Sequence, residues 1–266
     1  MKKKSPVLPV IIFLVLAIIG SILFYTFYYL PNARMSSQYV EFYQEYIADQ
    51  YASISIDAIN HDVIIKASED DLIHISFFQP IDNSNLCQDD GRNITINIIE
   101  EAPSAEGLFP GSYARYRTIS IYLPTSIYYS FSNKTVSGNL SIEGVNIRKL
   151  EAESVSGAIE IASSRMENTS VVTNSGLVSC SGCNYDVISI ESVTGDITLQ
   201  AALSKENYNL DLISRYGALM INSQRVMAQS GEDSIVINSY SQQIDSSMKI
   251  KLSSLRGQIA LDFPVN

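Results

Sequence analysis

The sequence predicts an all-β repeat protein, a β-solenoid or β-roll, that follows an N-terminal transmembrane helix. Three observations predict this fold. Apolar and polar residues alternate along most of the chain after residue 52, a glycine recurs about every 20 residues, and an uncharged apolar stretch stands near the N-terminus. The sequence leaves one alternative open, an antiparallel β-sandwich in which the same repeats would form a string of hairpins.

Composition limits the possible partners. The chain has 266 residues, and its net charge of −10 gives it an acidic surface. Such a surface repels nucleic acid and anionic lipid. The sequence also lacks the basic patches with interleaved aromatic residues that are typical of nucleic-acid binding. We therefore expect no nucleic acid among the partners.

The first predicted element is a transmembrane helix at residues 7–30, which contain no charged residue. About 20 apolar residues cross a bilayer as a helix, and a cleaved signal peptide has a shorter apolar core that ends in small residues. Because Lys2, Lys3 and Lys4 precede the helix, residues 1–6 are expected in the cytoplasm and the bulk of the chain outside. We expect an uncleaved single-pass anchor in the cell membrane, in contact with lipid.

A juxtamembrane stalk is predicted at residues 31–51. Val40, Tyr43 and Ile47 recur at helical spacing, so a short amphipathic helix is one interpretation of this stalk. The β-repeat ectodomain is predicted at residues 52–266, and it begins with alternating strands joined by turns.

The clear repeats, at residues 126–261, align on six glycines. Their separations are 19, 19, 19, 22 and 40 residues, and the last one predicts a degenerate copy near Ser230 and Gly231. A constant period near 20 residues indicates a solenoid, in which each coil buries its apolar side only when coils stack. The structural repeat glycines are Gly138, Gly157, Gly176, Gly195, Gly217 and Gly257.

The repeat columns predict which side chains face the core. The second and fourth residues after each glycine are apolar, as in Ile159 and Ile161, whereas the apolar residues before it stand at odd offsets, as in Leu150 and Ala152. A shift of one residue moves a strand's side chains to the other face, so the chain must bend before the glycine. The third residue before each glycine is Ser or Thr, which bonds backbone groups at corners. The glycine would permit both the bend and close stacking of the coils.

No recognisable catalytic motif is present in the sequence. His61 and His74 have no partner motif and are interpreted as structural. Asp196 has no carboxylate beside it in its repeat column, as a glycosidase acid–base pair would require. The acidic runs lack the spacing of a calcium loop and are interpreted as solvated turns: residues 69–71, 89–90 and 100–101.

Cys180 and Cys183 form a C-x-x-C pattern, and Cys87 is the third cysteine. Redox pairs with this spacing normally begin a helix, whereas Cys180 stands in a core-facing strand column. A local disulfide or two buried thiols are therefore expected, and three cysteines are too few for a four-cysteine zinc site. We expect no metal, no cofactor and no catalytic residue.

The segments "TVSGNLSI", "SVSGAIEI" and "SVTGDITL", with the preceding "ISIYLP", resemble the bacterial putative-adhesin family, a domain of unknown function built from repeated β-strands. The resemblance covers Ala52 to Leu261 and is strongest from Arg117 to Leu199. It implies a surface-exposed, often membrane-anchored protein, and some relatives are associated with cell-envelope stress systems. It supplies no catalytic residues.

The function expected from residues and resemblance together is a non-enzymatic, extracellular binding or structural module at the cell envelope. Its partner would be an envelope protein, a glycan or a second copy of the chain. An accessory sensor or regulator in a cell-envelope stress system is the alternative hypothesis. An enzyme that acts on cell-wall polysaccharide is a third one.

Overall fold

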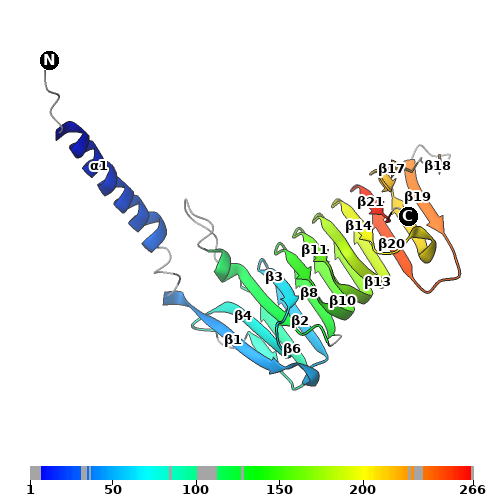
Figure 1. The fold of residues 1–266 in the computed structure, drawn as a ribbon, viewed down its shortest axis with the longest axis horizontal. Coiled ribbons are helices and arrows are strands. Elements are labelled where there is room, and N and C mark those ends of the chain that lie inside the picture. Colours follow the sequence, from blue (N-terminus) through cyan, green and yellow to red (C-terminus); the bar gives the residue numbers. More distant parts are fainter. Residues whose placement is uncertain are drawn as a thin grey trace, which may run out of the picture.

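The computed structural model describes residues 7–30, 35, 37–83, 86–100, 113–126, 129–226, 229–230 and 236–264. Within them the chain forms a body of β-strands, from which the helix α1 (Val7–Phe24) projects (Figure 1). The prediction of an all-β fold is thus confirmed. Lys2, Lys3, Lys4 and Gly231, which entered the sequence argument, lie outside the described residues.

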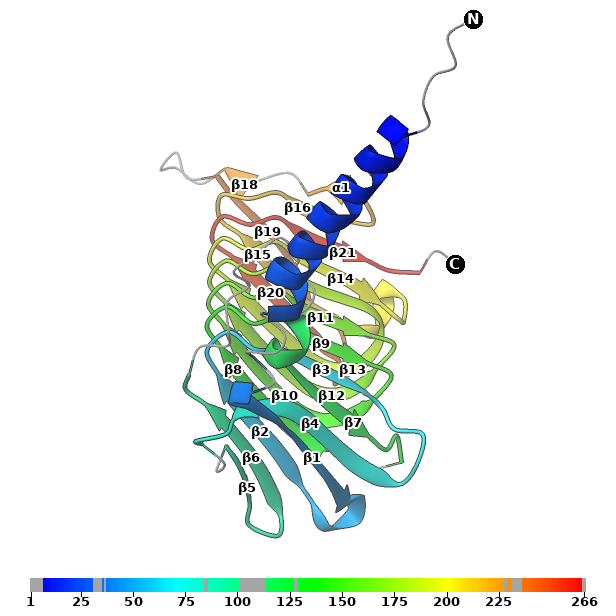
Figure 2. The same ribbon diagram turned by 90° about the vertical axis from the view of Figure 1, so that its left-hand side faces the viewer.

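Most strands belong to coils, each made of one strand before a corner and one strand after it (Figure 2). The strands before the corner pair in parallel as the pre-corner sheet, and those after it pair in parallel as the post-corner sheet. In spatial order the pre-corner sheet contains β6 (Asn93–Ile98), β2 (Ser53–Ala58), β8 (Tyr129–Thr135), β10 (Asn146–Ser154), β12 (Arg165–Thr173), the second half of β13 (Val178–Ser192), β20 (Lys249–Ser254) and β15 (Asn209–Ser214). The post-corner sheet contains β7 (Thr118–Leu123), β3 (Asp62–Ala67), β9 (Leu140–Glu143), β11 (Ile159–Ala162), the first half of β13, β14 (Ile197–Ala201), β21 (Ile259–Asp262) and β16 (Leu219–Ile221).

Parallel pairing decides between the two architectures that the sequence left open. Ile159 stands beside Val178 in the post-corner sheet, and Leu150 stands beside Thr169 in the pre-corner sheet. A sandwich made of hairpins would require antiparallel partners at these positions. The fold is therefore a β-solenoid, in which equivalent residues of successive repeats lie side by side.

The core lies between the two sheets, and the predicted columns form it. Ile159, Ile197 and Ile259 after the corner are each at most 1% exposed. Leu150 and Ala152 before the corner are equally buried, although they stand at the opposite parity. Both sets face inward because the chain turns at the corner, as the shift in parity required.

The stacking order of the coils differs from their order in the sequence. The β20–β21 coil lies between the β13–β14 coil and the β15–β16 coil. The last coil of the chain is therefore inserted between two coils that precede it in the sequence. The β2–β3 coil is inserted in the same way between β6–β7 and β8–β9. The expectation of a simple succession of repeats is wrong at both ends of the solenoid.

The 40-residue gap before Gly257, in which a degenerate copy is predicted, is described only in part. Its described part includes β19 (Val236–Gln242), which pairs antiparallel with β15. Antiparallel strands also cover the other edges of the solenoid, namely β17 (Gln224–Arg225) on β16, β5 (Cys87–Asp89) on β6 and β4 (Leu72–Pro80) on β7, and β18 (Gln229–Ser230) pairs antiparallel with β19. Such caps satisfy backbone groups that open sheet edges would leave free for pairing with other chains.

The predicted juxtamembrane helix is replaced by a strand. β1 (Tyr39–Ile47) pairs antiparallel with β4 along its whole length and is followed by a short 3₁₀ helix. Phe42 stacks on Phe77 of β4 with ring centroids 4.8 Å apart, and Val40 and Tyr43, two of the residues at helical spacing, are exposed. Aromatic and β-branched residues favour a pleated surface, and the open edge of β4 supplies the partner that a free helix would lack.

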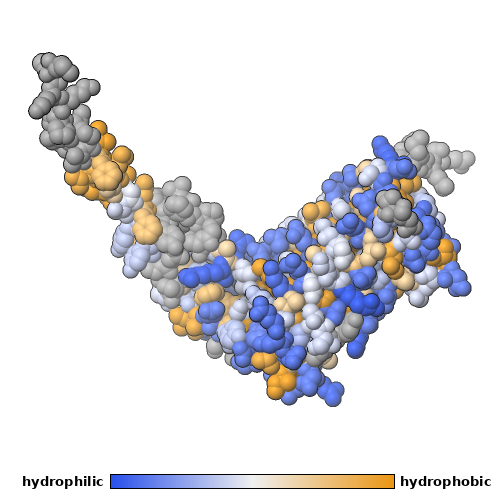
Figure 3. All heavy atoms as spheres, in the orientation of Figure 1, coloured by the Kyte–Doolittle hydropathy of each residue, from blue (hydrophilic) through white to orange (hydrophobic). Residues whose placement is uncertain are grey.

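The apolar stretch at residues 7–30 forms α1 and then a π-helical turn at Tyr25–Tyr29. Among the described residues, no helix combines the length and the hydropathy that a membrane crossing demands. The described side chains of α1 are apolar and exposed, and they stand out against the mixed surface of the β-body (Figure 3).

Candidate functional site

In the coils that contain a repeat glycine, a buried hydroxyl group lies next to that glycine at the corner, and the hydroxyl of Ser254 has no hydrogen-bond partner among the described residues. The backbone N–H of Gly157 donates to Ser154 Oγ at 2.9 Å, and that of Gly176 donates to Thr173 Oγ1 at 3.0 Å. Ser154 and Thr173 are themselves buried, so the predicted role of the Ser/Thr column is confirmed. The hydroxyl replaces a backbone partner that the turn takes away from the amide.

The glycines make close stacking possible rather than an unusual turn. A Cβ atom on Gly157 would overlap the carbonyl oxygen of Gly138, and a Cβ atom on Gly176 would overlap that of Gly157. None of the six repeat glycines has a positive φ. Of the two roles expected for glycine, close approach of neighbouring backbones is the one that the geometry requires.

Exposed aliphatic side chains lie on the outer side of these corners in two neighbouring rows, three of them close to the glycines and Val172 beside Glu153 and Glu191. Val136, Val155 and Val193 stand two residues before a repeat glycine, and Val172 stands four before its glycine. Their side chains are 42–48% exposed. We call these four residues the valine stripe. Exposed apolar side chains that gather on one side of an otherwise polar sheet mark an interaction site more often than scattered apolar residues do.

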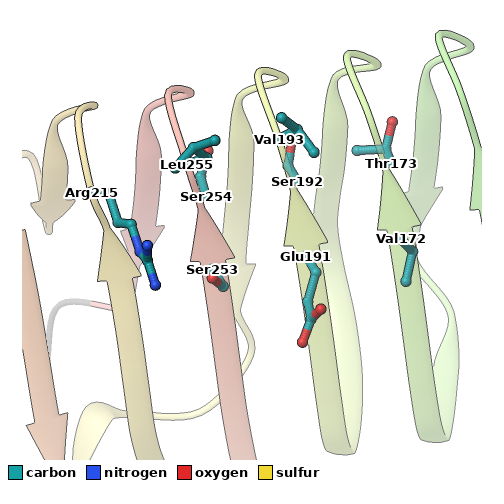
Figure 4. Close-up of a pocket in the computed structure, with 9 residues that line it drawn as sticks. All are labelled: Val172, Thr173, Glu191, Ser192, Val193, Arg215, Ser253, Ser254 and Leu255. Atoms are coloured by element: carbon teal, nitrogen blue, oxygen red, sulfur yellow. The ribbon is translucent and has the colours of Figure 1, made fainter.

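Val155, Val172 and Val193 of the valine stripe line a series of adjoining cavities, the corner groove. One cavity of about 280 Å³ lies between Val172 and Arg215, with Val193 and Leu255 on its walls (Figure 4). A second of about 350 Å³ continues toward Lys134 and also contains Val172 and Val193. Val172 lies in a third of about 170 Å³ as well, so neighbouring cavities share their walls.

Charged side chains frame the groove. Lys134 Nζ lies 3.3 Å from Glu153 Oε2 on one side of Val172, and Lys251 Nζ lies 3.2 Å from Glu191 Oε1 on the other. Arg215, at the end of the groove, has no acidic partner among the described residues. The groove can therefore bind an aliphatic chain, with Arg215 available for an acidic group of the ligand.

The described lining of the groove holds no histidine, cysteine or aspartate. Its carboxylates Glu151, Glu153 and Glu191 are paired with Lys149, Lys134 and Lys251, respectively. Elsewhere, the part of the chain that the structure describes has no group of three or more potential metal ligands. The carboxylate of Asp90 accepts hydrogen bonds from the backbone of Arg92 and Asn93, as a turn residue does.

The three cysteines are free thiols. Cys180 and Cys183 are buried where β13 passes from the post-corner to the pre-corner sheet, and burial raises the pKa of both. Cys87 is half-buried at the capped end of the solenoid, with its Sγ 3.5 Å from the hydroxyl of Tyr46. The structure brings none of the three close to the corner groove.

The two histidines occupy different environments. His61 is buried at the head of the glycine column, where its carbonyl oxygen lies against Gly138. Burial, together with the charge of Arg117, lowers the pKa of His61 to about 4. His74 lies on β4 in a pocket of about 330 Å³ that also contains Tyr43 and Asp70.

Sequence reasoning missed both the corner groove and the cluster around His74. The valines were visible in "TVSG", "SVSG" and "SVTG", at an offset from the glycine that differs from the core-facing offsets. The pairing of Asp70 with His74 was visible as a spacing of four residues, but Tyr43 and Glu45 come from a strand that the sequence suggested to be helical.

A family model described as Toastrack DUF4097 matches residues 51–265. No curated protein matches the sequence significantly. Two solved structures are similar over 85% of this chain, at 14% identity and a TM-score of 0.43: a putative cell adhesion protein from Clostridium sporogenes ATCC 15579, covered over 100% of its length, and a putative adhesin from Bacteroides fragilis NCTC 9343, covered over 97%. Since the family model spans most of the β-body, the chain belongs to the Toastrack DUF4097 family.

Proposed function

We propose that this chain is a membrane-anchored, extracytoplasmic binding module whose corner groove holds a segment of another envelope protein. The observation that carries the proposal is the valine stripe, four aliphatic side chains 42–48% exposed on the outer side of the corners. When a partner covers exposed aliphatic side chains, the apolar surface removed from water favours binding by about 25 cal/mol per Å². The names of the two solved structures agree with an adhesin-like role, but the proposal rests on the groove.

The chemistry of the groove supports binding rather than catalysis. Its carboxylates Glu151, Glu153 and Glu191 are each paired with a lysine, so no unpaired carboxylate of the described lining faces the valine stripe. It is also open to solvent and shallow (Figure 4), whereas catalysis normally requires a site that excludes water.

The arrangement of charges favours a different protein over a second copy of this chain. A two-fold axis through Val172 would place Glu153 of one copy opposite Glu191 of the other, because these residues flank Val172 on neighbouring strands. Like charges in contact oppose association. A protein segment with aliphatic side chains and one acidic group near Arg215 would satisfy both the stripe and the unpaired guanidinium.

Attachment to the membrane through residues 7–30 is part of the proposal. The sequence supports it, since this stretch has no charged residue, and the described side chains of α1 pack against no part of the β-body. Lys2, Lys3 and Lys4 support a cytoplasmic N-terminus. Carbonate extraction and protease protection of the full chain in cells test anchoring and orientation.

The binding test places a photo-cross-linking amino acid at position 172 or 177 of the full chain in its own membranes. Leu177 is 43% exposed but does not line the groove, so position 177 is the matched control. We expect one discrete adduct from position 172 and none of the same mass from position 177. The double change Val155→Asp with Val193→Asp should abolish the adduct, while Leu177→Asp should preserve it. The same adduct from both positions, or an adduct that survives the double change, contradicts the proposal.

Arg215→Gln tests the acidic group of the partner. We expect the yield of the adduct to fall about tenfold, whereas Arg225→Gln on the neighbouring cap strand should leave it unchanged. Equal yields from the two variants would show that Arg215 does not contact the partner.

A further inference from the structure

His74 lies at the centre of a chain of short polar contacts that joins β1 to the solenoid. Its Nε2 is 2.8 Å from Asp70 Oδ1, and its Nδ1 is 3.0 Å from the hydroxyl oxygen of Tyr43. The same hydroxyl lies 2.6 Å from Glu45 Oε1, and His74 Nδ1 is itself 3.5 Å from that oxygen. Tyr43 and Glu45 belong to β1, whereas His74 belongs to β4, and Glu45 stands directly opposite it in the strand register.

Counting protons determines which form of His74 fits this geometry. Asp70 Oδ1 already accepts from the hydroxyl of Ser68 at 2.8 Å and from the amide of Leu72 at 3.0 Å, so it faces Nε2 as an acceptor. Nε2 must therefore carry a proton. Ionisation of Asp70 is consistent with this, since the hydrogen bond from His74, followed by those from Leu72 and Ser68, lowers the pKa of its carboxyl to about 2.

The remaining question is the proton on Nδ1. The hydroxyl of Tyr43 has one proton, and it cannot donate to Glu45 and to Nδ1 at the same time. With Nδ1 unprotonated and Glu45 ionised, as exposed carboxylates are at neutral pH, either the Tyr43–Glu45 contact or the Tyr43–His74 contact has no proton between its two atoms. With Nδ1 protonated, Nδ1–H donates to Tyr43, Tyr43 donates to Glu45, and every contact is a hydrogen bond.

The charged groups around the ring agree with a cation at this position. Glu45 approaches from β1, Glu69 and Asp70 approach from the turn before β4, and Tyr122 of β7 lines the same pocket. Lys66 of β3, which stands beside Tyr122 in the sheet, is held by Glu143 at 3.3 Å. The described groups that face the ring are thus acidic or neutral.

We propose that doubly protonated His74 is a latch that fastens β1 to the solenoid, and that loss of one ring proton loosens this strand. β1 precedes residues 51–265, which the family model matches, and it follows the N-terminal helix. The latch therefore acts on the connection between the proposed anchor and the repeat domain. The backbone pairing with β4 and the stacking of Phe42 on Phe77 do not depend on the proton, so β1 loosens without being released.

The sign of the pH effect follows from linkage. Because the protonated ring makes the additional contacts, protection of β1 is greatest at low pH and decreases as pH rises through the titration of His74. The contacts are partly exposed, and His74 and Glu45 side chains are 18% and 48% exposed. The expected decrease in the protection factors of β1 is therefore small, about two- to fivefold.

The test uses the full chain in lipid nanodiscs and two measurements on the same sample. Nitrogen NMR of ¹⁵N-labelled histidine follows the protonation of both rings, which is feasible because His61 and His74 are the two histidines of the chain. Hydrogen exchange, corrected for intrinsic rates, follows the amides of β1 with those of β11 as an internal reference. We expect the protection factors of the β1 amides to change at the same pH at which the NMR signals of His74 change. The protection factors of the β11 amides should not depend on pH. The proposal is overturned if the protection of β1 and the NMR signals of His74 change at different pH values, or if the protection of β1 stays constant while the His74 signals change.

Variants give an independent test. His74→Gln should remove the pH dependence of β1, and Glu45→Gln should reduce it. Glu41→Gln changes an exposed carboxylate on the same strand that stands opposite Phe78 rather than His74. The pH dependence of β1 protection in this variant should be the same as in the wild type. If His74→Gln retains the wild-type pH profile, or if Glu41→Gln and Glu45→Gln behave alike, the latch is not formed by these residues.

Discussion

Gly257 packs directly on Gly195, although the whole β15–β16 coil lies between them in the sequence. A Cβ atom on Gly257 would overlap the carbonyl oxygen of Gly195, and a Cβ atom on Gly217 would overlap that of Gly257. The glycine column therefore continues from Gly195 to Gly257 although these two coils are not consecutive in the sequence. Backbone contact at the corner, rather than chain succession, aligns the coils.

The first prediction concerns this column. Gly157→Ala places a Cβ atom on the carbonyl group of Gly138. The oxygen and carbon of this group are backbone atoms, which cannot rotate away as a side chain could. We expect the free energy of unfolding to fall by about 1–3 kcal/mol, the usual range for overpacking a core. Chemical denaturation of the full chain in detergent measures it. Gly20→Ala, at a glycine with no atom near its Cβ position, is the control and should leave the midpoint unchanged.

A second prediction concerns the hydroxyl that completes the corner. Thr173→Val keeps the shape of the side chain but leaves the buried amide of Gly176 without its acceptor. We expect a loss of about 1–3 kcal/mol, the cost of an unpaired buried polar group. Thr198→Val changes an exposed threonine on the outer face of β14 and should have little effect. Equal losses in the two variants would mean that the Thr173 hydroxyl does not support the corner.

Much of the solenoid could be predicted from sequence because its signals are local. The parity of apolar residues around each glycine fixes which side chains face inward, and Ile159, Ile197 and Ile259 are buried accordingly. The coil order could not be predicted in this way, because the six coils with a repeat glycine all carry the same glycine and a Ser or Thr three residues before it. Nothing within a repeat distinguishes Gly217 from Gly257 as the partner of Gly195.

The candidate sites were less predictable for a related reason. The corner valines have the same residue type as core residues, and only their place relative to the bend shows that they face solvent. The contacts of His74 depend on β1, whose pairing with β4 is a tertiary contact that helical spacing of Val40, Tyr43 and Ile47 obscured. Periodicity identifies a face only when the partner surface is known.

A third prediction concerns the cysteines. Cys180 and Cys183 are at most 1% exposed, and burial raises the pKa of both thiols, so neither forms the reactive thiolate in the folded state. We expect both to resist iodoacetamide until the chain unfolds, with Cys87, which is half-buried, modified earlier. Mass spectrometry of the labelled peptides after a time course measures the order. Detection of a Cys180–Cys183 disulfide in the purified protein would contradict the prediction.

The fourth prediction is a pH dependence due to His61. Its pKa is lowered from 6.5 to about 4 by burial and then by the charge of Arg117. Between these two values the unfolded chain binds the proton and the folded chain does not, so the free energy of unfolding falls as pH falls from 6.5 to 4. The expected loss is at most about 3 kcal/mol. Asp70 acts in a separate pH range. Because its pKa is lowered from 3.8 to about 2 in the folded chain, its contribution to the free energy of unfolding is lost only as pH falls below 3.8.

The measurement is chemical denaturation at a series of pH values in a His74→Gln background, which leaves His61 as the one histidine of the chain. His61→Leu in that background removes the titrating group together with a buried ring nitrogen, Nδ1, that has no hydrogen-bond partner. We expect the slope between pH 6.5 and 4 to flatten in this variant while the decline below pH 3.8 remains. An unchanged slope would mean that His61 becomes protonated in the folded chain as readily as in the unfolded one, and that the corner above Gly138 admits water.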